Sequence, residues 1–251
     1  DIEAILLRGA DGCFCSGLDL KEFNADPEPD WMSDFGQIWR RVHRRLYETE
    51  KPVIAVLERF AINGGAALAL AADVLLVGKN SFLQVGEVQQ GMAAPYNLAW
   101  LKLRYSEAII SQLTLVGRRF TGEELLRMGV AYASPNDAEV LSIARTLMKD
   151  LSKYPPGALS RIKRTMRSYV DETADEWFDR ATKYAENITG ENGCIKKECS
   201  LWTENLKHRQ HLEGGLNNTW NGTPSPKYLT YVIHGNLILM CPGYDESDAL
   251  E

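Results

Sequence analysis

Two glycine-containing turns decide how this chain folds: Phe-Cys-Ser-Gly-Leu-Asp-Leu at residues 14–20 and Asn-Gly-Gly at residues 63–65. Each turn follows an apolar run that predicts a buried strand, at residues 3–8 and 53–57. A stretch of small residues follows the second turn and predicts a tightly packed helix, and a third apolar run at 73–77 predicts another strand. Strand, turn, helix and strand in this order indicate an α/β layer with largely parallel strands.

Helical spacing of apolar residues predicts further helices around this layer. Thr121 with Glu124 forms a capping box, which predicts a short helix that stops at Gly129. Longer amphipathic helices are predicted over 31–50, 137–153, 157–186 and 194–209, with Pro155-Pro156 separating the second from the third.

Composition excludes several classes of protein. The chain has 251 residues, of which 45% are hydrophobic and 25% charged, so it is neither disordered nor collagen nor a coiled coil. A net charge of −6 and a pI near 5.4 disfavour binding to nucleic acid or to an anionic membrane. No apolar stretch is long enough to span a bilayer, and no signal peptide is evident. Five cysteines are too few for a disulfide scaffold, so we expect an intracellular protein, cytoplasmic or organellar.

The two turns also carry the candidate chemistry. Backbone N–H groups at such turns are not used by the helix that follows, and two of them pointing at one oxygen stabilise developing negative charge. A single glycine turn is more often only a tight turn, so this interpretation depends on the longer pattern. The four histidines and the Cys194/Cys199 pair have no spacing typical of a metal site.

The longer pattern resembles the enoyl-CoA hydratase/isomerase (crotonase) superfamily over roughly residues 3–210. The resemblance is carried, in order, by the stretches 4–22, 51–73, 81–91 and 114–130. It implies an α/β crotonase (ClpP-like) spiral of strand–strand–helix units with a C-terminal helical region for self-association. It also implies an acyl-CoA thioester as substrate, with no cofactor other than the CoA of the substrate, no metal, and a homotrimer or hexamer.

The resemblance further implies which residues form the site. The backbone N–H groups of Leu18 and Gly64 would hold the thioester oxygen, and the substrate would lie along Ser16, Gly17, Leu18, Asp19, Leu20, Gly64 and Gly65. Hydratases of the family have two glutamates; here the first position is Ala67 and the second is Glu87. Adding water needs two groups, whereas moving a double bond needs one base. A lone glutamate at the second position is similar to the Δ3,Δ2-enoyl-CoA isomerases, and so Glu87 is the expected base.

Other functions stay open. Hydration, decarboxylation or thioester hydrolysis would use the same enolate, and hydration would be favoured by a second carboxylate, for instance Glu58. A local ion pair between Glu58 and Arg59 is the simpler expectation for that position. A catalytically silent acyl-CoA-binding or protein-binding member is the alternative from a different class.

The chain divides into four predicted regions. Residues 1–155 form the spiral core, 156–210 the helical region, 211–227 a linker, and 228–251 a strand pair. That pair resembles the strand with which family members usually open, and we expect it to fill the empty edge of the core sheet. The arginines at 40–45 are expected on a solvated helix face, and Cys13 and Cys15 are expected to pack in the first turn.

Overall fold

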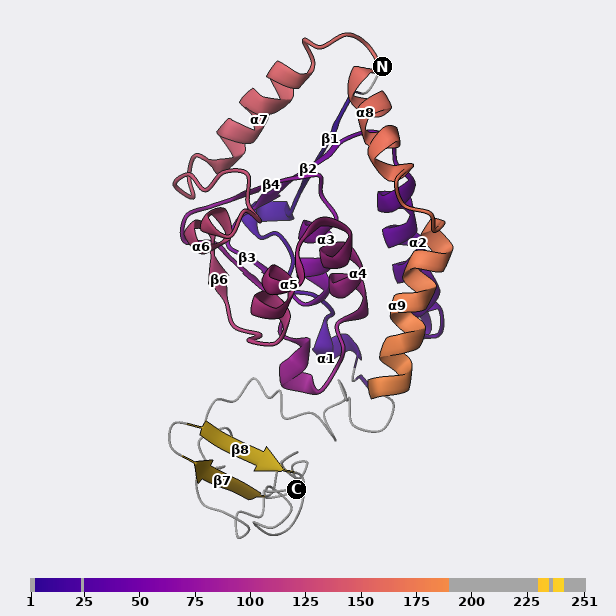
Figure 1. Ribbon diagram of the computed structural model, residues 1–251, viewed down its shortest axis with the longest axis vertical. Helices are drawn as coiled ribbons and strands as arrows, with labels where there is room; N and C mark the ends of the chain where they lie inside the picture. Colours follow the sequence, from indigo (N-terminus) through magenta and orange to yellow (C-terminus); the bar gives the residue numbers. More distant parts are fainter. Residues whose placement is uncertain (1–2, 24, 190–229, 235–236, 242–251) are drawn as a thin grey trace.

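A computed structural model gives the fold of residues 3–23, 25–189, 230–234 and 237–241 (Figure 1). The first sheet contains β1 (Ile5–Arg8), β2 (Val53–Leu57) and β4 (Val74–Val77), all parallel and in the order β1-β2-β4. The predicted strands of the layer are therefore confirmed, with their ends shifted by at most two residues.

A second sheet contains the short strands that follow β2 and β4 along the chain; the family resemblance implied such strands, but the apolar pattern did not locate them. It contains β3 (Phe60–Ile62), β5 (Phe82–Gln84) and β6 (Phe120–Thr121), with β3 parallel and β6 antiparallel to β5. The chain thus repeats a unit of strand, strand and helix: β2, β3 and α3 (Gly64–Leu70), then β4, β5 and α4 (Pro95–Arg104). This repetition is the expected spiral of ββα units.

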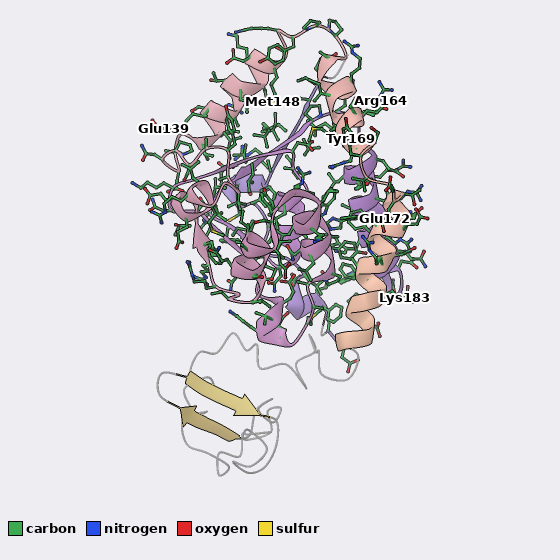
Figure 2. All side chains as sticks on the ribbon, in the orientation of Figure 1. Glu139, Met148, Arg164, Tyr169, Glu172 and Lys183 are labelled. Carbon is green, nitrogen blue, oxygen red and sulfur yellow. The ribbon has the colours of Figure 1, made fainter. Side chains whose placement is uncertain are left out.

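The central strand β2 is buried on both faces, and its side chains alternate between two cores. Val53, Ala55 and Leu57 belong to the large core with α3 and α4, whereas Ile54 and Val56 face α7 (Val140–Leu151). Side chains, among them the labelled Met148, fill the space between α7 and the sheet in Figure 2. Helices on both faces therefore explain the continuous apolar run of this strand.

Two helices cover the outer side of α4. The chain passes from a short 3-10 turn (Asp30–Asp34) into α2 (Phe35–Glu48), which lies beside α9 (Ala174–Thr189) (Figure 1). Arg40 and Arg44 form ion pairs with Asp179 and Asp175 of α9, at 2.6 and 2.9 Å. Both arginine side chains keep 40% or more of their surface exposed, so the predicted solvated face is present and also carries ion pairs to the acidic side chains of α9.

The predicted helix over 157–186 is two helices, α8 (Ala158–Arg167) and α9. The break has a local cause in the sequence. The side-chain oxygen of Thr173 accepts a hydrogen bond from the Glu176 N–H, and the Glu176 carboxylate accepts one from the Thr173 N–H. This is a capping box, which starts a new helix at this position, and it resembles the predicted box at Thr121, which is confirmed at the start of α6 (Gly122–Arg127).

The C-terminal strands form as predicted but pair differently. Strands β7 (Thr230–His234) and β8 (Leu237–Cys241) make an antiparallel two-stranded sheet of their own. Among the described strands of this chain, neither pairs with β1, so the expectation that they fill the edge of the core sheet is not met within one chain. The predicted helix at 194–209 and the linker at 211–227 lie outside the described residues.

Gly65 offers a direct test of how tightly the two turns pack. A Cβ at this position would lie 2.2 Å from the Cys15 carbonyl oxygen, which is backbone and cannot rotate away. We expect Gly65→Ala to lower the free energy of unfolding by roughly 1–3 kcal/mol, measured by urea denaturation. Gly36→Ala on α2 is the control, because a Cβ at Gly36 meets nothing within 4 Å. Equal stabilities of the two variants would contradict this packing.

Candidate active site

The two glycine turns lie side by side because the first turn adds to the second sheet. The Cys15 N–H donates to the Phe60 carbonyl at 3.2 Å, and the Ile62 N–H donates to the Cys15 carbonyl at 3.1 Å. Cys15 is thereby paired with Ala61 in parallel register. The chain leaves this ladder at Gly17 and at Asn63, so both turns begin at the same edge.

Gly17 and Gly64 are in close approach. Gly17 has φ +93°, which L side chains rarely adopt, and a Cβ there would lie 2.9 Å from the Ile62 carbonyl oxygen and 3.5 Å from the Gly64 nitrogen. Within the described part of the chain, neither the Leu18 N–H nor the Gly64 N–H donates a hydrogen bond to a protein acceptor. Two unused backbone donors therefore begin neighbouring turns, as an oxyanion site requires.

Asn63 connects the second turn to the segment that carries Glu87. Its backbone has φ 51° and ψ −111°, so the positive φ expected of this position is present. Its N–H donates to the Gln84 carbonyl at 2.9 Å, and its Oδ1 accepts from the Gly86 N–H at 2.8 Å. A glycine could adopt the same φ but would leave the Gly86 N–H without this acceptor. The side chain is thus a positioning group that the sequence pattern alone did not reveal.

Glu87 begins a short 3-10 helix (Glu87–Gln90) after β5 and is only 8% exposed. Its Oε1 accepts a hydrogen bond from Asn97 Nδ2 at 2.7 Å, and the same amide nitrogen donates to the Asn63 carbonyl at 3.1 Å. Because both partners are acceptors, the amide group of Asn97 must present its NH2 to them. The other oxygen, Oε2, is buried and has no hydrogen-bond partner among the described residues. One carboxylate oxygen is therefore fixed and the other is free to take a proton.

Burial raises the pKa of Glu87 from 4.5 to about 7, since a charged carboxylate is poorly solvated in the core. The hydrogen bonds from its own backbone N–H and from Asn97 act in the opposite direction and limit the rise. A carboxyl group with a pKa near neutrality exchanges a proton readily in both directions, which suits a general base that later returns the proton.

The position of the first family glutamate is filled by Ala67, which is fully buried in α3. Glu58, the other candidate for a second carboxylate, pairs with Arg8 on β1 at 2.8 Å. The expected ion pair with Arg59 is therefore wrong. Arg59 has φ 60°, and its Nη1 donates to Cys13 Sγ at 3.1 Å. Cys15 Sγ accepts a hydrogen bond from the Gly17 N–H at 3.4 Å. Both cysteines therefore pack in the first turn, as expected.

The remaining predicted substrate residues follow the first turn. Ser16 and Asp19 are exposed, and the Asp19 carboxylate accepts a hydrogen bond from the Glu22 N–H in α1 (Leu20–Phe23). Leu20 is the first residue of that helix.

An aromatic cluster behind Gly64 was not predicted. Trp39 of α2 lies against Gly64, since a Cβ on Gly64 would be 3.4 Å from the indole ring. Behind it, His43 is fully buried, stacks on Tyr96 and accepts a hydrogen bond from Trp100 Nε1 at 2.8 Å. Burial lowers the pKa of His43 to about 3, so the imidazole is neutral. The spacing of Trp39 and His43 on α2 could have indicated a helix face turned toward α4.

In the part of the chain that the structure describes, no group of three His, Cys, Asp or Glu side chains is arranged to hold a metal ion. Among the same residues, no helix combines the length and apolar character needed to cross a bilayer.

Comparison with known proteins agrees with this geometry. The family model for enoyl-CoA hydratase/isomerase matches residues 1–209. A carnitinyl-CoA dehydratase of Proteus mirabilis is 31% identical over 177 residues, which cover 70% of this chain and 67% of the relative. The crystal structure of an enoyl-CoA hydratase from Mycobacterium marinum superposes with a TM-score of 0.62 at 25% identity, over 73% of this chain and 80% of the other. An enoyl-CoA isomerase of Mtb, 24% identical, has the same fold with a TM-score of 0.62, over 72% of this chain and 79% of the other.

The spiral of ββα units and the adjacent turns define an α/β enzyme of the crotonase fold. The chain belongs to the enoyl-CoA hydratase/isomerase family.

The raised pKa of Glu87 predicts a pH-dependent stability. Since the folded pKa of about 7 exceeds the unfolded value of 4.5, the charged form destabilises the fold, increasingly as the pH rises through this window. Glutamine mimics the protonated acid. We therefore expect Glu87→Gln to be more stable than the wild type by on the order of 3 kcal/mol at pH 8 and by less than about 1 kcal/mol at pH 5. Urea denaturation at the two pH values checks this, and a difference that does not change with pH would contradict it.

Proposed function

We propose that this protein moves the double bond of an enoyl-CoA, with Glu87 as the base and the N–H groups of Leu18 and Gly64 as the oxyanion site. The observation that carries the proposal is the buried carboxylate of Glu87, whose Oε2 has no partner among the described residues and whose segment is hydrogen-bonded to the turn that bears Gly64. The family and the acyl-CoA substrates named for its relatives support a thioester as the substrate.

In the reaction Glu87 first removes a proton and later returns it, and the two N–H groups stabilise the intermediate between these steps. Glu87 Oε2 takes a proton from the carbon beside the thioester of a 3-enoyl-CoA, and the electron pair moves onto the thioester oxygen as a conjugated enolate. The two N–H groups hold that negative charge. The protonated Glu87 then gives the proton to the carbon at the far end of the conjugated system, and the double bond is left next to the thioester. No water and no second carboxylate take part.

Hydration is the second candidate, because the curated relatives are named as dehydratases. It would need a further group to position water. The pairing of Glu58 with Arg8, and the presence of Ala67 where hydratases of the family have their first glutamate, argue against hydration.

Self-association as a trimer or hexamer is also a proposal. The exposed apolar residues Ile162 and Met166 lie one turn apart on α8 and support it.

Turnover of a panel of CoA esters separates these functions. We expect the wild type to convert a 3-enoyl-CoA to the 2-enoyl-CoA, and Glu87→Gln to lose on the order of 10²–10⁴-fold in kcat, the usual contribution of a general base. Glu58→Gln is the matched control and should keep its activity. Net addition of water to a 2-enoyl-CoA would favour the hydratase instead, and binding of the CoA ester without turnover would favour a silent member of the family.

The contact between Asn97 and Glu87 predicts a change in the pH profile. For the wild type, kcat/KM should rise with pH around 7 as Glu87 ionises. Asn97→Ala removes a hydrogen bond that favours the charged carboxylate, so its inflection should lie at higher pH. Asn136→Ala, at an exposed amide on the surface, serves as control. An Asn97→Ala enzyme with reduced activity but an unshifted inflection would assign Asn97 a purely structural role.

A further inference from the structure

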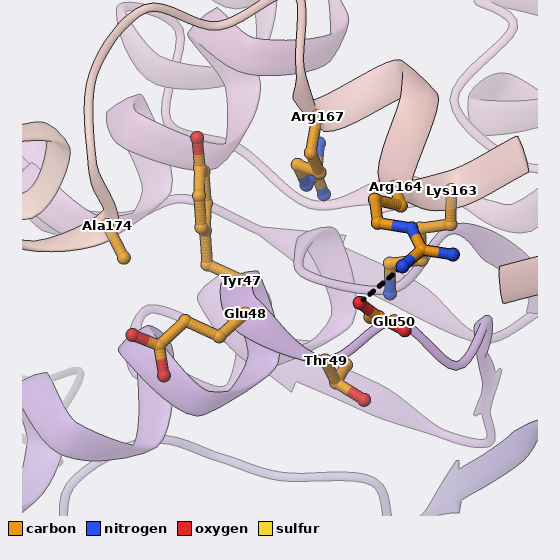
Figure 3. Close-up of a pocket in the computed structure, with 8 residues that line it drawn as sticks. All are labelled: Tyr47, Glu48, Thr49, Glu50, Lys163, Arg164, Arg167 and Ala174. Carbon is orange, nitrogen blue, oxygen red and sulfur yellow. Dashed lines mark ion pairs between the residues drawn. The ribbon is translucent and has the colours of Figure 1, made fainter. Parts of the chain in front are cut away.

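A cavity lies at the opposite end of the core sheet from the candidate active site. It has a volume of about 200 Å³ and lies where the end of α2, the segment leading into β2, and α8 meet (Figure 3). Its lining consists of Tyr47, Glu48, Thr49, Glu50, Lys163, Arg164, Arg167 and Ala174. The active-site turns follow the carboxyl ends of parallel strands, whereas this cavity borders residues that precede β2. A volume this small fits an ion rather than a CoA-sized ligand.

Two cations of the lining, Lys163 and Arg167, belong to a cluster around Asp73, which, like Arg104, is not itself a lining residue. Asp73 is approached by three cations: Lys163 at 2.6 Å, Arg104 at 3.3 Å and Arg167 at 3.9 Å. Each of the four side chains is less than one-fifth exposed. Three cations around one carboxylate leave two formal positive charges in a poorly solvated place, which is unfavourable unless a counter-ion is present.

The acidic residues of the lining do not offset this excess. Glu48 forms ion pairs with Arg44 at 2.7 Å and Arg45 at 3.5 Å, both outside the cavity. Glu50 is paired with Arg164 at 3.6 Å, as the dashed line in Figure 3 shows. Among the residues that the structure describes, Arg167 has Asp73 as its ion-pair partner and shares it with Lys163 and Arg104.

Arg167 has unused hydrogen-bonding capacity. In the described part of the chain its guanidinium donates no hydrogen bond, and its Nε and Nη2 atoms are buried without a partner. Its nearest polar contact is the ion pair at 3.9 Å, and its charge lies 5.0 Å from the Tyr47 ring. In Figure 3 the Arg167 side chain projects beside Tyr47 toward the middle of the lining. Lys163 donates to Asp73 and to the Lys51 carbonyl, so one of its three N–H groups is still available.

We propose that this cavity binds a small, doubly charged oxyanion, phosphate or sulfate, contacted by Arg167 and Lys163. Two negative charges match the two that are uncompensated around Asp73, and tetrahedral oxygens accept hydrogen bonds from a guanidinium and an ammonium together. Both contacts come from α8, and an anion that binds only the folded chain stabilises that chain by mass action.

The test is thermal unfolding and titration calorimetry of the full chain with sodium phosphate, at constant ionic strength set with sodium chloride. We expect saturable binding to the wild type and a rise in Tm of roughly 5–10 °C at phosphate about 100-fold above its dissociation constant. Arg167→Met should lose both effects. Without phosphate this variant should be as stable as the wild type or more stable, because it removes an incompletely paired buried charge. Arg161→Met, at an exposed position on α8 outside the cavity, should bind phosphate normally.

The proposal would be overturned if phosphate bound equally to the wild type and to Arg167→Met and raised their Tm equally, or if it did not bind the wild type. The cavity would then hold only water. A comparison of inorganic phosphate with glycerol 3-phosphate identifies the source of the anion. Binding of inorganic phosphate alone indicates a free ion, whereas binding of both indicates the phosphoryl group of a larger ligand.

Discussion

The close approach of residues 14–17 to residues 60–65 is the constraint on which the rest of the site depends. Cys15 can pair with the second sheet only because Gly65 has no side chain where the Cys15 carbonyl lies, and Gly17 can turn away only because it tolerates a positive φ. This contact brings two backbone segments together without using the N–H groups of Leu18 or Gly64. Asn63 then extends the same contact to the Glu87 segment through its hydrogen bonds to Gln84 and Gly86. Close packing of the backbone at small residues is thus the structural basis of the site.

The parallel strands and the two glycine turns could be predicted because both depend on local patterns, whereas the roles of Leu18, Gly64 and Glu87 came from the family resemblance. Continuous apolar runs mark strands buried on both faces, and glycines mark turns where a Cβ would collide. The strands of the second sheet were implied by the resemblance but were not located, since they have only two or three residues and no distinct alternation. The break between α8 and α9 was missed although Thr173 and Glu176 form a capping box, because the apolar spacing continues across it.

Tertiary contacts account for what no pattern could reveal. Asn97 reaches Glu87 from a helix ten residues further along the chain, and Trp39 reaches Gly64 from α2. The partner of Glu58 is Arg8, fifty residues away, rather than its neighbour Arg59. The unusual burial of Glu87, and with it the pKa near 7, is also a property of the folded chain, because the surrounding sequence does not differ from that of a surface loop.

The two ends of the core sheet have opposite electrostatic character, and both are incomplete in the folded chain. At the carboxyl ends of the strands, among the described residues, a carboxylate has one oxygen without a partner and is linked through Asn97 to the turn that bears the unused Gly64 N–H. At the amino ends, three cations share one aspartate. Buried polar groups without partners lower stability, so a fold tolerates them mainly where a ligand completes them. Under the two proposals, the first set would accept a thioester that is neutral in the ground state and negative in the enolate, whereas the second would hold a permanent dianion. The first therefore favours catalysis and the second favours tight, static binding.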